Sequence, residues 1–229
     1  MKMLIIGEKY REKLEKHLNS LGFEMFWLPD NTDTNIKLSG HCDLSVFIYD
    51  KTAILASYLK GCELVNLLTN RGYKVIISTE KQNELYPKDV NLCASIINNK
   101  LLHYSRYTDK AILNLELECI NVKQGYTRCS CLIFGNSVIT SDKGIAAALK
   151  RNNIETLLIG NDGIILDGYD RGFIGGASFV CDNTVYFIGD INKHPDGKSI
   201  TDFIRDHDYK IVCLCDGELF DIGGAIVVS

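Results

Sequence analysis

Short apolar runs separated by polar turn residues recur along the chain, and this pattern predicts four β-hairpins. The hairpins span residues 44–55, 92–103, 129–140 and 177–188. Their turns are the dipeptides Asp50-Lys51, Asn98-Asn99, Gly135-Asn136 and Asp182-Asn183. Asn, Asp and Gly tolerate the positive φ angles that tight hairpin turns require, so each run is expected to fold back on the previous one.

Each predicted hairpin is followed by a stretch of helical periodicity and then by a third apolar run. The expected helices span 58–71, 108–117, 141–152 and 196–207. The expected third strands span 73–78, 118–122, 154–159 and 209–214. Apolar residues recur at three- to four-residue spacing in the helices, and Ser, Thr or Asp stands near most helix starts, where it can cap free backbone N–H groups. The repeating unit is therefore strand, strand, helix, strand.

The two ends of the chain together supply a fifth unit. The N-terminus predicts a strand at 1–6, a helix at 8–21 and a strand at 23–28, but it lacks the unit's first strand. The C-terminus supplies one strand, 225–229, after an Ile-Gly-Gly sequence that also occurs at 174–176. The fold predicted is a single α/β domain of residues 1–229, a five-fold pseudosymmetric α/β propeller of ββαβ repeats closed by the C-terminal strand.

Composition narrows the classes of partner and cofactor. A net charge of −4 argues against a general nucleic-acid surface. No apolar run reaches the ~18 residues that span a bilayer, and the N-terminal apolar run ends at Glu8, so we expect a cytoplasmic protein without membrane association. Gly7 stands without a G-x-G-x-x-G pattern and there is no P-loop, so no cofactor is expected. The pattern leaves the oligomeric state open.

The nine cysteines are expected to be reduced thiols, because their number is odd and no export signal precedes them. Cys129 and Cys131 are spaced i, i+2, which on a strand directs both thiols to one face. Zinc motifs usually have two to four intervening residues in a turn, so no metal site is predicted.

Several longer motifs resemble a known protein family. The segments are YPKDVNLCASIINNKLLHY, YTDKAIL, VKQGYTRCSCLIFGNSVITSDKGIAAAL, LLIGNDGIILDGYDRGFIGGASF and DINKHPD. They look like an uncharacterised bacterial family of the pentein, or guanidine-modifying-enzyme, fold, and the resemblance runs from about residue 86 to the end. That superfamily includes arginine deiminases, dimethylarginine dimethylaminohydrolases, agmatine deiminases, amidinotransferases and non-enzymatic ribosome anti-association factors.

The resemblance implies a chemistry that this chain lacks in one essential part. Enzymes of the superfamily use a Cys nucleophile on the last strand, a His base and carboxylates that hold a guanidinium group. Here Val227 and Val228 stand in the corresponding region, and no cysteine follows Cys215. The usual deiminase, hydrolase and amidinotransferase mechanism is therefore not expected.

A displaced thiol site is the alternative. Cys129 follows Arg128, whose charge would lower a thiol pKa, and His41, His103 or His194 could serve as the partner base. Our candidate catalytic residues are Cys129 and His194. The competing interpretation is that the cysteines pack in the core and that His194-Pro195-Asp196 forms a helix N-terminus.

Candidate ligand-binding residues come from the polar linkers that precede the predicted inner strands. The resemblance implies that such linkers lie at the mouth of a central channel; any solvent-facing loop or turn would have the same composition. The candidates are Lys123, Gln124, Tyr126, Cys131, Asp167, Asp170, Phe173 and Asp221.

These observations favour a non-catalytic protein that binds a small cationic or amide-bearing molecule in its central channel. The first alternative is an unconventional thiol hydrolase acting on a guanidine or amide C–N bond. The second is a protein- or ribosome-interaction module.

Overall fold

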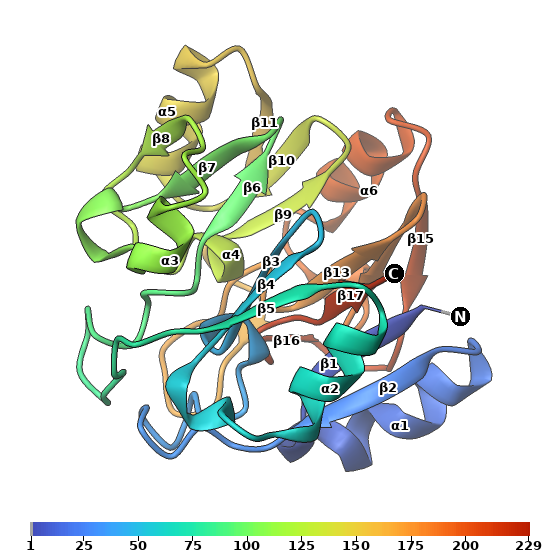
Figure 1. Ribbon diagram of the computed structural model, residues 1–229. Coiled ribbons are helices and arrows are strands. Elements are labelled where there is room, and N and C mark those ends of the chain that lie inside the picture. The colour runs from blue at the N-terminus through green and yellow to red at the C-terminus, as the bar shows by residue number, and fades with distance from the viewer. Residues whose placement is uncertain (1) are drawn as a thin grey trace.

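The computed structural model describes residues 2–229, and its strands form five three-stranded sheets of the same design (Figure 1). The sheets are β17 (Ile226–Val228), β1 (Met3–Gly7) and β2 (Glu24–Leu28); β3 (Val46–Tyr49), β4 (Thr52–Leu55) and β5 (Lys74–Ile77); β6 (Ser95–Ile97), β7 (Lys100–His103) and β8 (Cys119–Asn121); β9 (Cys131–Phe134), β10 (Ser137–Thr140) and β11 (Glu155–Leu158); and β13 (Ser178–Cys181), β14 (Thr184–Phe187) and β15 (Lys210–Cys213).

Every one of these sheets has the same pairing. The first strand runs antiparallel to the middle strand, and the third runs parallel to it. The four predicted hairpin turns are confirmed, since Asp50, Asn98, Asn99, Gly135 and Asp182 all adopt φ between 50° and 58°. The alternation of apolar runs and turn residues therefore predicted these strands correctly.

The helices connect middle and third strands, and most are shorter than predicted. They are α1 (Arg11–Ser20), α2 (Glu63–Asn70), α3 (Lys110–Leu113), α4 (Thr127–Ser130), α5 (Lys143–Arg151) and α6 (Gly197–Arg205). Of these, α4 is the exception in position, because it precedes β9. The predicted helix 58–71 loses its first turn because Gly61 has φ 84°. The predicted helix 108–117 ends early because Glu116 has φ 54°. Asp142 caps α5 by accepting a hydrogen bond from the Ile145 N–H at 2.8 Å.

The two ends of the chain meet in one sheet. β17 pairs antiparallel with β1, placing Val228 opposite Met3 and Ile226 opposite Ile5. This pairing was predicted from the split unit at the termini. Within residues 2–229 the five sheets stay separate and do not form one continuous closed sheet.

A sixth, two-stranded sheet holds the segments on which the candidate site depends. β12 (Ile164–Ile165) pairs parallel with β16 (Leu219–Phe220). The ladder continues as the Asp221 N–H donates to the Ile165 carbonyl at 2.8 Å. This bond holds the backbone of Asp221 beside the loop that follows Ile165.

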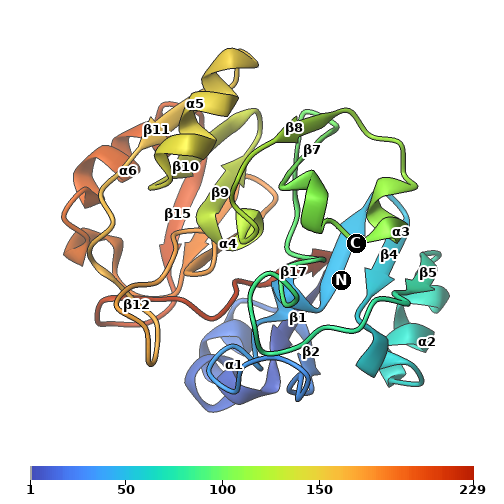
Figure 2. The same ribbon diagram turned by 90° about the vertical axis from the view of Figure 1, so that its left-hand side faces the viewer.

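The apolar core lies between neighbouring sheets and under the helices. One cluster joins Leu4 and Ile6 of β1 to Leu14 and Leu18 of α1 and reaches Phe179 of β13. Apart from α4, the helices lie at the periphery, and β17 runs near the middle of the molecule (Figure 2). Over the described residues, no helix has the length and apolarity to cross a membrane.

Candidate functional site

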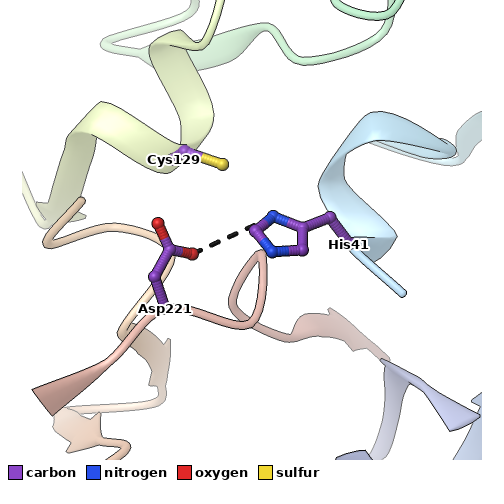
Figure 3. A group of neighbouring side chains, drawn as sticks. All are labelled: His41, Cys129 and Asp221. Carbon is purple, nitrogen blue, oxygen red and sulfur yellow. Dashed lines mark ion pairs between the residues drawn. The ribbon is translucent and has the colours of Figure 1, made fainter. Parts of the chain in front are cut away.

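Polar side chains from four separate segments of the chain lie close together in the interior. They are His41 and Asp43 around the 3₁₀ turn Cys42–Leu44, Cys93 before β6, Cys129 on α4, and Asp221 after β16. All five are almost fully buried. Figure 3 shows Cys129, His41 and Asp221 converging from three directions, with the thiol and the carboxylate facing the imidazole ring. We call these five residues the buried polar cluster.

Asp221 is held by backbone hydrogen bonds to both of its oxygens. Oδ2 accepts from the Phe173 N–H at 2.8 Å, and Oδ1 accepts from the Gly223 N–H at 2.9 Å. A Cβ on Gly176 would lie 1.9 Å from Oδ1, so the carboxylate occupies space that a side chain at position 176 would need. The two Ile-Gly-Gly sequences therefore meet here. Gly176 of the first leaves room for the carboxylate of Asp221, which directly precedes the second.

Asp43 is the acceptor for two thiols. The Cys129 thiol donates to Oδ2 at 2.5 Å, and the Cys93 thiol donates to the same oxygen at 3.4 Å. The other oxygen, Oδ1, is buried without a hydrogen-bond partner. Asp43 therefore retains one free acceptor in the middle of the cluster.

His41 lies between the two carboxylates. Its Nδ1 is 3.9 Å from Asp43 Oδ1 and 3.9 Å from Asp221 Oδ1, too far for a hydrogen bond. Its Nε2 is buried without a partner. The imidazole has polar neighbours on one side but makes no hydrogen bond to them.

Burial controls the protonation of this cluster. Loss of solvent raises the pKa of Asp221 to about 7 and that of Asp43 to about 6, and it lowers the pKa of His41 to about 3. The neighbouring Cys93 and burial raise the pKa of the Cys129 thiol well above its ordinary value. At neutral pH the cluster therefore holds a neutral imidazole, protonated thiols and carboxylates close to their titration range.

A cavity of about 280 Å³ opens onto the cluster, and we call it the aromatic cavity. The ring centroids of Tyr126 and Phe173 are 6.4 Å apart on its wall, with their planes at 29°. Asp170 and Arg171 are exposed lining residues. The complete lining is Leu38, His41, Tyr126, Cys129, Leu166, Tyr169, Asp170, Arg171, Phe173 and Asp221. Such a mixture of apolar walls and a few polar groups is typical of small-molecule sites.

A second cavity of about 280 Å³ is lined by the first strand of each of the five sheets, and we call it the channel cavity. Its polar side chains include Arg128, Ser95 and Ser178, and its lining residues from β17 include Val227. No acidic side chain belongs to this lining in the part of the chain that the structure describes. The channel cavity and the aromatic cavity differ in the charge that they present.

Five of the residues predicted from the sequence come together. Tyr126, Cys129, Asp170, Phe173 and Asp221 all line the aromatic cavity. Cys131 lines the channel cavity instead. The prediction that Cys129 already belongs to the strand is wrong, because α4 occupies Thr127–Ser130 and β9 begins at Cys131. The helical turn directs the two thiols into different cavities.

The remaining predicted residues lie outside both linings. His194 is in the turn before α6, where its Nδ1 accepts a hydrogen bond from the Asp196 N–H at 3.0 Å. Gln124 donates to Asp142 at 3.3 Å and accepts from the Tyr126 N–H at 3.1 Å, so it fixes the linker. Lys123 and Asp167 are exposed. The histidine beside Cys129 is His41, one of the three partners that the sequence left open.

Asp43 and Cys93 were not predicted from the sequence. Cys93 stands in an apolar run, and Asp43 lies in a short polar segment between predicted strands, so the local pattern marks neither as part of a site. The sequence His41-Cys42-Asp43, with three titratable side chains in succession, was the available hint.

Solved structures similar to this chain show its fold. A dimethylarginine dimethylaminohydrolase (DDAH) from Pseudomonas aeruginosa, complexed with citrulline, matches with a TM-score of 0.59 and 11% identity over 92% of this chain and 91% of that one. A dimethylarginine dimethylaminohydrolase adduct with S-methyl-L-thiocitrulline has a TM-score of 0.61 and 11% identity over 99% of both chains. Agmatine deiminase of C. jejuni has a TM-score of 0.55 and 10% identity over 93% of this chain and 86% of that one.

These likenesses establish the pentein, guanidine-modifying fold that the motifs had suggested. Comparison with curated proteins gave no match. One family model covers residues 5–226, nearly the whole chain. The chain therefore belongs to the family described as "Family of unknown function (DUF6873)" and has the pentein fold.

Proposed function

We propose that the protein binds a small organic cation, of the guanidinium or amidinium type, in the aromatic cavity. The observation that carries the proposal is the position of Asp221, a fully buried carboxylate at the inner end of a cavity walled by Tyr126 and Phe173. Aromatic faces attract cations, and a carboxylate forms charge-assisted hydrogen bonds to them.

The aromatic cavity replaces the central channel as the expected ligand site. Arg128 lines the channel cavity, and no carboxylate of the described residues belongs to that lining. A bound cation would therefore meet a positive charge there and have no oppositely charged partner. The aromatic cavity has Asp221 at its inner end and Asp170 at an exposed position. Arg171 also lines it, so a ligand that carries a carboxylate at its other end, as an amino acid does, would have a partner for each charge.

We infer that the five sheets surround the channel cavity as blades of a propeller. The support is that this cavity takes its lining from the first strand of every sheet, including β17 at the C-terminus. In this arrangement the linkers that precede those strands carry Tyr126, Phe173 and Asp221 to one end of the ring.

The ligand proposal is tested by calorimetric titration with arginine, agmatine and citrulline. Arginine should bind more tightly than citrulline, which has nearly the same shape but no guanidinium charge. Asp221→Asn should weaken arginine binding by about 10- to 100-fold, because hydrogen bonds to charged groups contribute ~1.5–3 kcal/mol. Asp167→Asn, an exposed neighbour outside the cavity lining, is the matched control and should bind as the wild type does.

Two results would reject the ligand proposal. One is equal affinity for arginine and citrulline, which would mean that the positive charge is not recognised. The other is the same loss of affinity in Asp221→Asn and Asp167→Asn.

The convergence of Cys129 and His41 favours a second candidate, thiol-dependent hydrolysis of a C–N bond. The Cys129 thiol would pass its proton to His41 and attack the central carbon of the bound ligand. The amine would leave with that proton. Water would then cleave the S–C bond and restore the thiol. The raised pKa of the thiol makes the resting enzyme unreactive in this scheme.

Alkylation with a short iodoacetamide pulse at pH 6 separates this candidate from simple binding. Arginine or agmatine should slow the alkylation of a catalytic Cys129, because either ligand would lie against its thiol in the aromatic cavity, and ammonia should be released by the wild type but not by Cys129→Ser. Alkylation that neither ligand changes, with no ammonia formed, would remove the hydrolase. The protein- or ribosome-interaction module stays an untested prediction.

A further inference from the structure

We propose that Asp43, Cys93, Cys129 and His41 form a zinc-binding site at the centre of the buried polar cluster. No short sequence motif predicts this site, because the four ligands come from three separate segments: residues 41–43, the segment before β6 and the turn α4. Topology, and not linear spacing, brings them together.

Donor atoms of three of these residues already converge. Ligand atoms of Asp43, Cys93 and Cys129 lie within 4.8 Å of one another, and His41 belongs to a neighbouring group with Cys129 and Asp221. Zinc at its usual bond lengths holds its donors roughly 3.3–3.8 Å apart. The distance from Cys93 Sγ to Asp43 Oδ2 is 3.4 Å, and that from His41 Nδ1 to the other oxygen, Asp43 Oδ1, is 3.9 Å. Cys129 Sγ lies 2.5 Å from Asp43 Oδ2 and would move outward by about 1 Å on zinc binding.

Unpartnered polar atoms point to an ion at this position. Asp43 is fully buried, and its Oδ1 has no hydrogen-bond partner. His41 is 2% exposed, and its Nδ1 lies 3.9 Å from Asp43 Oδ1, too far for a hydrogen bond. Leaving a buried polar group unsatisfied costs ~1–3 kcal/mol, and more for a charged one. A bound cation would give the carboxylate a partner and would replace two weak thiol donors with metal–thiolate bonds.

Asp221 is left outside the proposed ligand set because each of its oxygens already accepts a backbone N–H group, from Phe173 and Gly223, whereas Asp43 Oδ1 has no partner. The remaining lone pairs of Asp221 can still accept hydrogen bonds from an organic cation. His41 and Cys129 also line the aromatic cavity, so zinc would lie beside the organic-cation site. The tests distinguish the two proposals, because one measures zinc stoichiometry and the cobalt spectrum and the other measures arginine binding.

The donor set selects zinc over the commoner hard cations. Magnesium and calcium prefer oxygen ligands, whereas two thiols, an imidazole and one carboxylate match the borderline-soft preference of zinc. The ion would also tie three chain segments together, because its ligands precede β3, precede β6 and precede β9. Zinc would then act as a structural cross-link under the three sheets.

The test uses the full-length protein, purified under reducing conditions and stripped with a chelator. Zinc should return at one equivalent per chain and raise the melting temperature. Cobalt in its place should give a thiolate-to-cobalt charge-transfer band in the near ultraviolet and the d–d spectrum of a tetrahedral site. Cys129→Ser and Asp43→Asn should each weaken zinc binding by more than about 100-fold, beyond the 10- to 100-fold typical of outer-shell partners.

Cys131→Ser is the matched control, because Cys131 is buried two residues away but lines the channel cavity. It should bind zinc and cobalt as the wild type does. Each variant is first checked for native near-ultraviolet circular dichroism, and Cys93→Ser replaces Cys129→Ser if the latter does not fold. The proposal is overturned if the reduced wild type binds no stoichiometric zinc, if the cobalt spectrum lacks the thiolate band, or if the cluster variants bind zinc as tightly as Cys131→Ser. Rapid alkylation of Cys129 in zinc-loaded protein would also overturn it.

Discussion

Gly176→Ala should destabilise the protein through one contact, with the carboxylate of Asp221. The three atoms nearest to a Cβ at position 176 are all in this carboxyl group, at 1.9, 2.4 and 2.8 Å. Real Cβ atoms essentially never come closer than about 3.0 Å to another heavy atom. The carboxylate, or the backbone at Gly176, must therefore move by about 1 Å.

The size of the effect follows from what holds Asp221. Moving the carboxylate by about 1 Å stretches its bonds to the Phe173 and Gly223 N–H groups from 2.8 and 2.9 Å to beyond hydrogen-bonding distance. Each charge-assisted bond contributes about 1.5–3 kcal/mol, so we expect a loss of about 3 kcal/mol or more. For a chain of this length that lowers the melting temperature by roughly 6–12 °C.

A double-mutant cycle in urea isolates the contact. Gly176→Ala should cost about 3 kcal/mol in the wild type but less than about 1 kcal/mol in an Asp221→Ala background, where the obstructing carboxylate is gone. Gly144→Ala is the control, because Gly144 lies in the first turn of α5 and its Cβ would be within 4 Å of one atom, Asp142 Oδ1 at 3.1 Å. The preference of a helix for alanine opposes this close contact with the capping oxygen, so the variant should stay within about 1 kcal/mol of the wild type.

Either of two results would contradict this origin of the destabilisation. Gly176→Ala could be as stable as the wild type, which would mean that the Asp221 carboxylate leaves room for a side chain at position 176. Alternatively, the cost could be the same in both backgrounds, which would place its origin outside Asp221.

Three further predictions concern other parts of the fold. His103 is fully buried, its Nε2 is 2.7 Å from the Gly125 carbonyl, and burial lowers its pKa to about 4, so the unfolded chain binds this proton first. Between pH 7 and pH 4 the wild type should therefore lose about 3 kcal/mol of stability relative to His103→Gln in urea titrations, because the other titrating groups are common to both proteins. Asp142→Ala removes the cap of α5 and should cost about 1 kcal/mol, whereas Asp216→Ala on an exposed loop should stay within ~0.5 kcal/mol by the same urea titration. Deleting residues 226–229 removes β17 and leaves β1 unpaired on that side, so the cooperative thermal transition should be lost, while deleting Ser229 alone should preserve it.

The repeats were predictable because their signals are local. A turn such as Asp182-Asn183 between two apolar runs specifies a hairpin through backbone sterics alone, and the structure has Asp182 at φ 52°. The pairing of the two chain ends was also predictable, because a half unit at the N-terminus and a lone strand at the C-terminus have unsatisfied edges that complement each other.

The candidate site was predictable in part. Tyr126, Phe173 and Asp221 stood out as polar or aromatic residues in the linkers, and they do meet in one cavity. Asp43 and Cys93 did not stand out in the sequence, because their role depends on a contact between segments 50 residues apart, which no local periodicity encodes. The face of Cys129 was mispredicted for a related reason: the backbone of residues 127–130 forms a helical turn, although the apolar run beside it has the period of a strand.

The central claim is that Asp221, at the inner end of the aromatic cavity, recognises an organic cation. Calorimetric titration of arginine into the wild type, Asp221→Asn and Asp167→Asn tests it most directly. We predict one saturable site in the wild type and in Asp167→Asn, with an affinity about 10- to 100-fold lower in Asp221→Asn. Absence of arginine binding to the wild type, or unchanged affinity in Asp221→Asn, would contradict the claim.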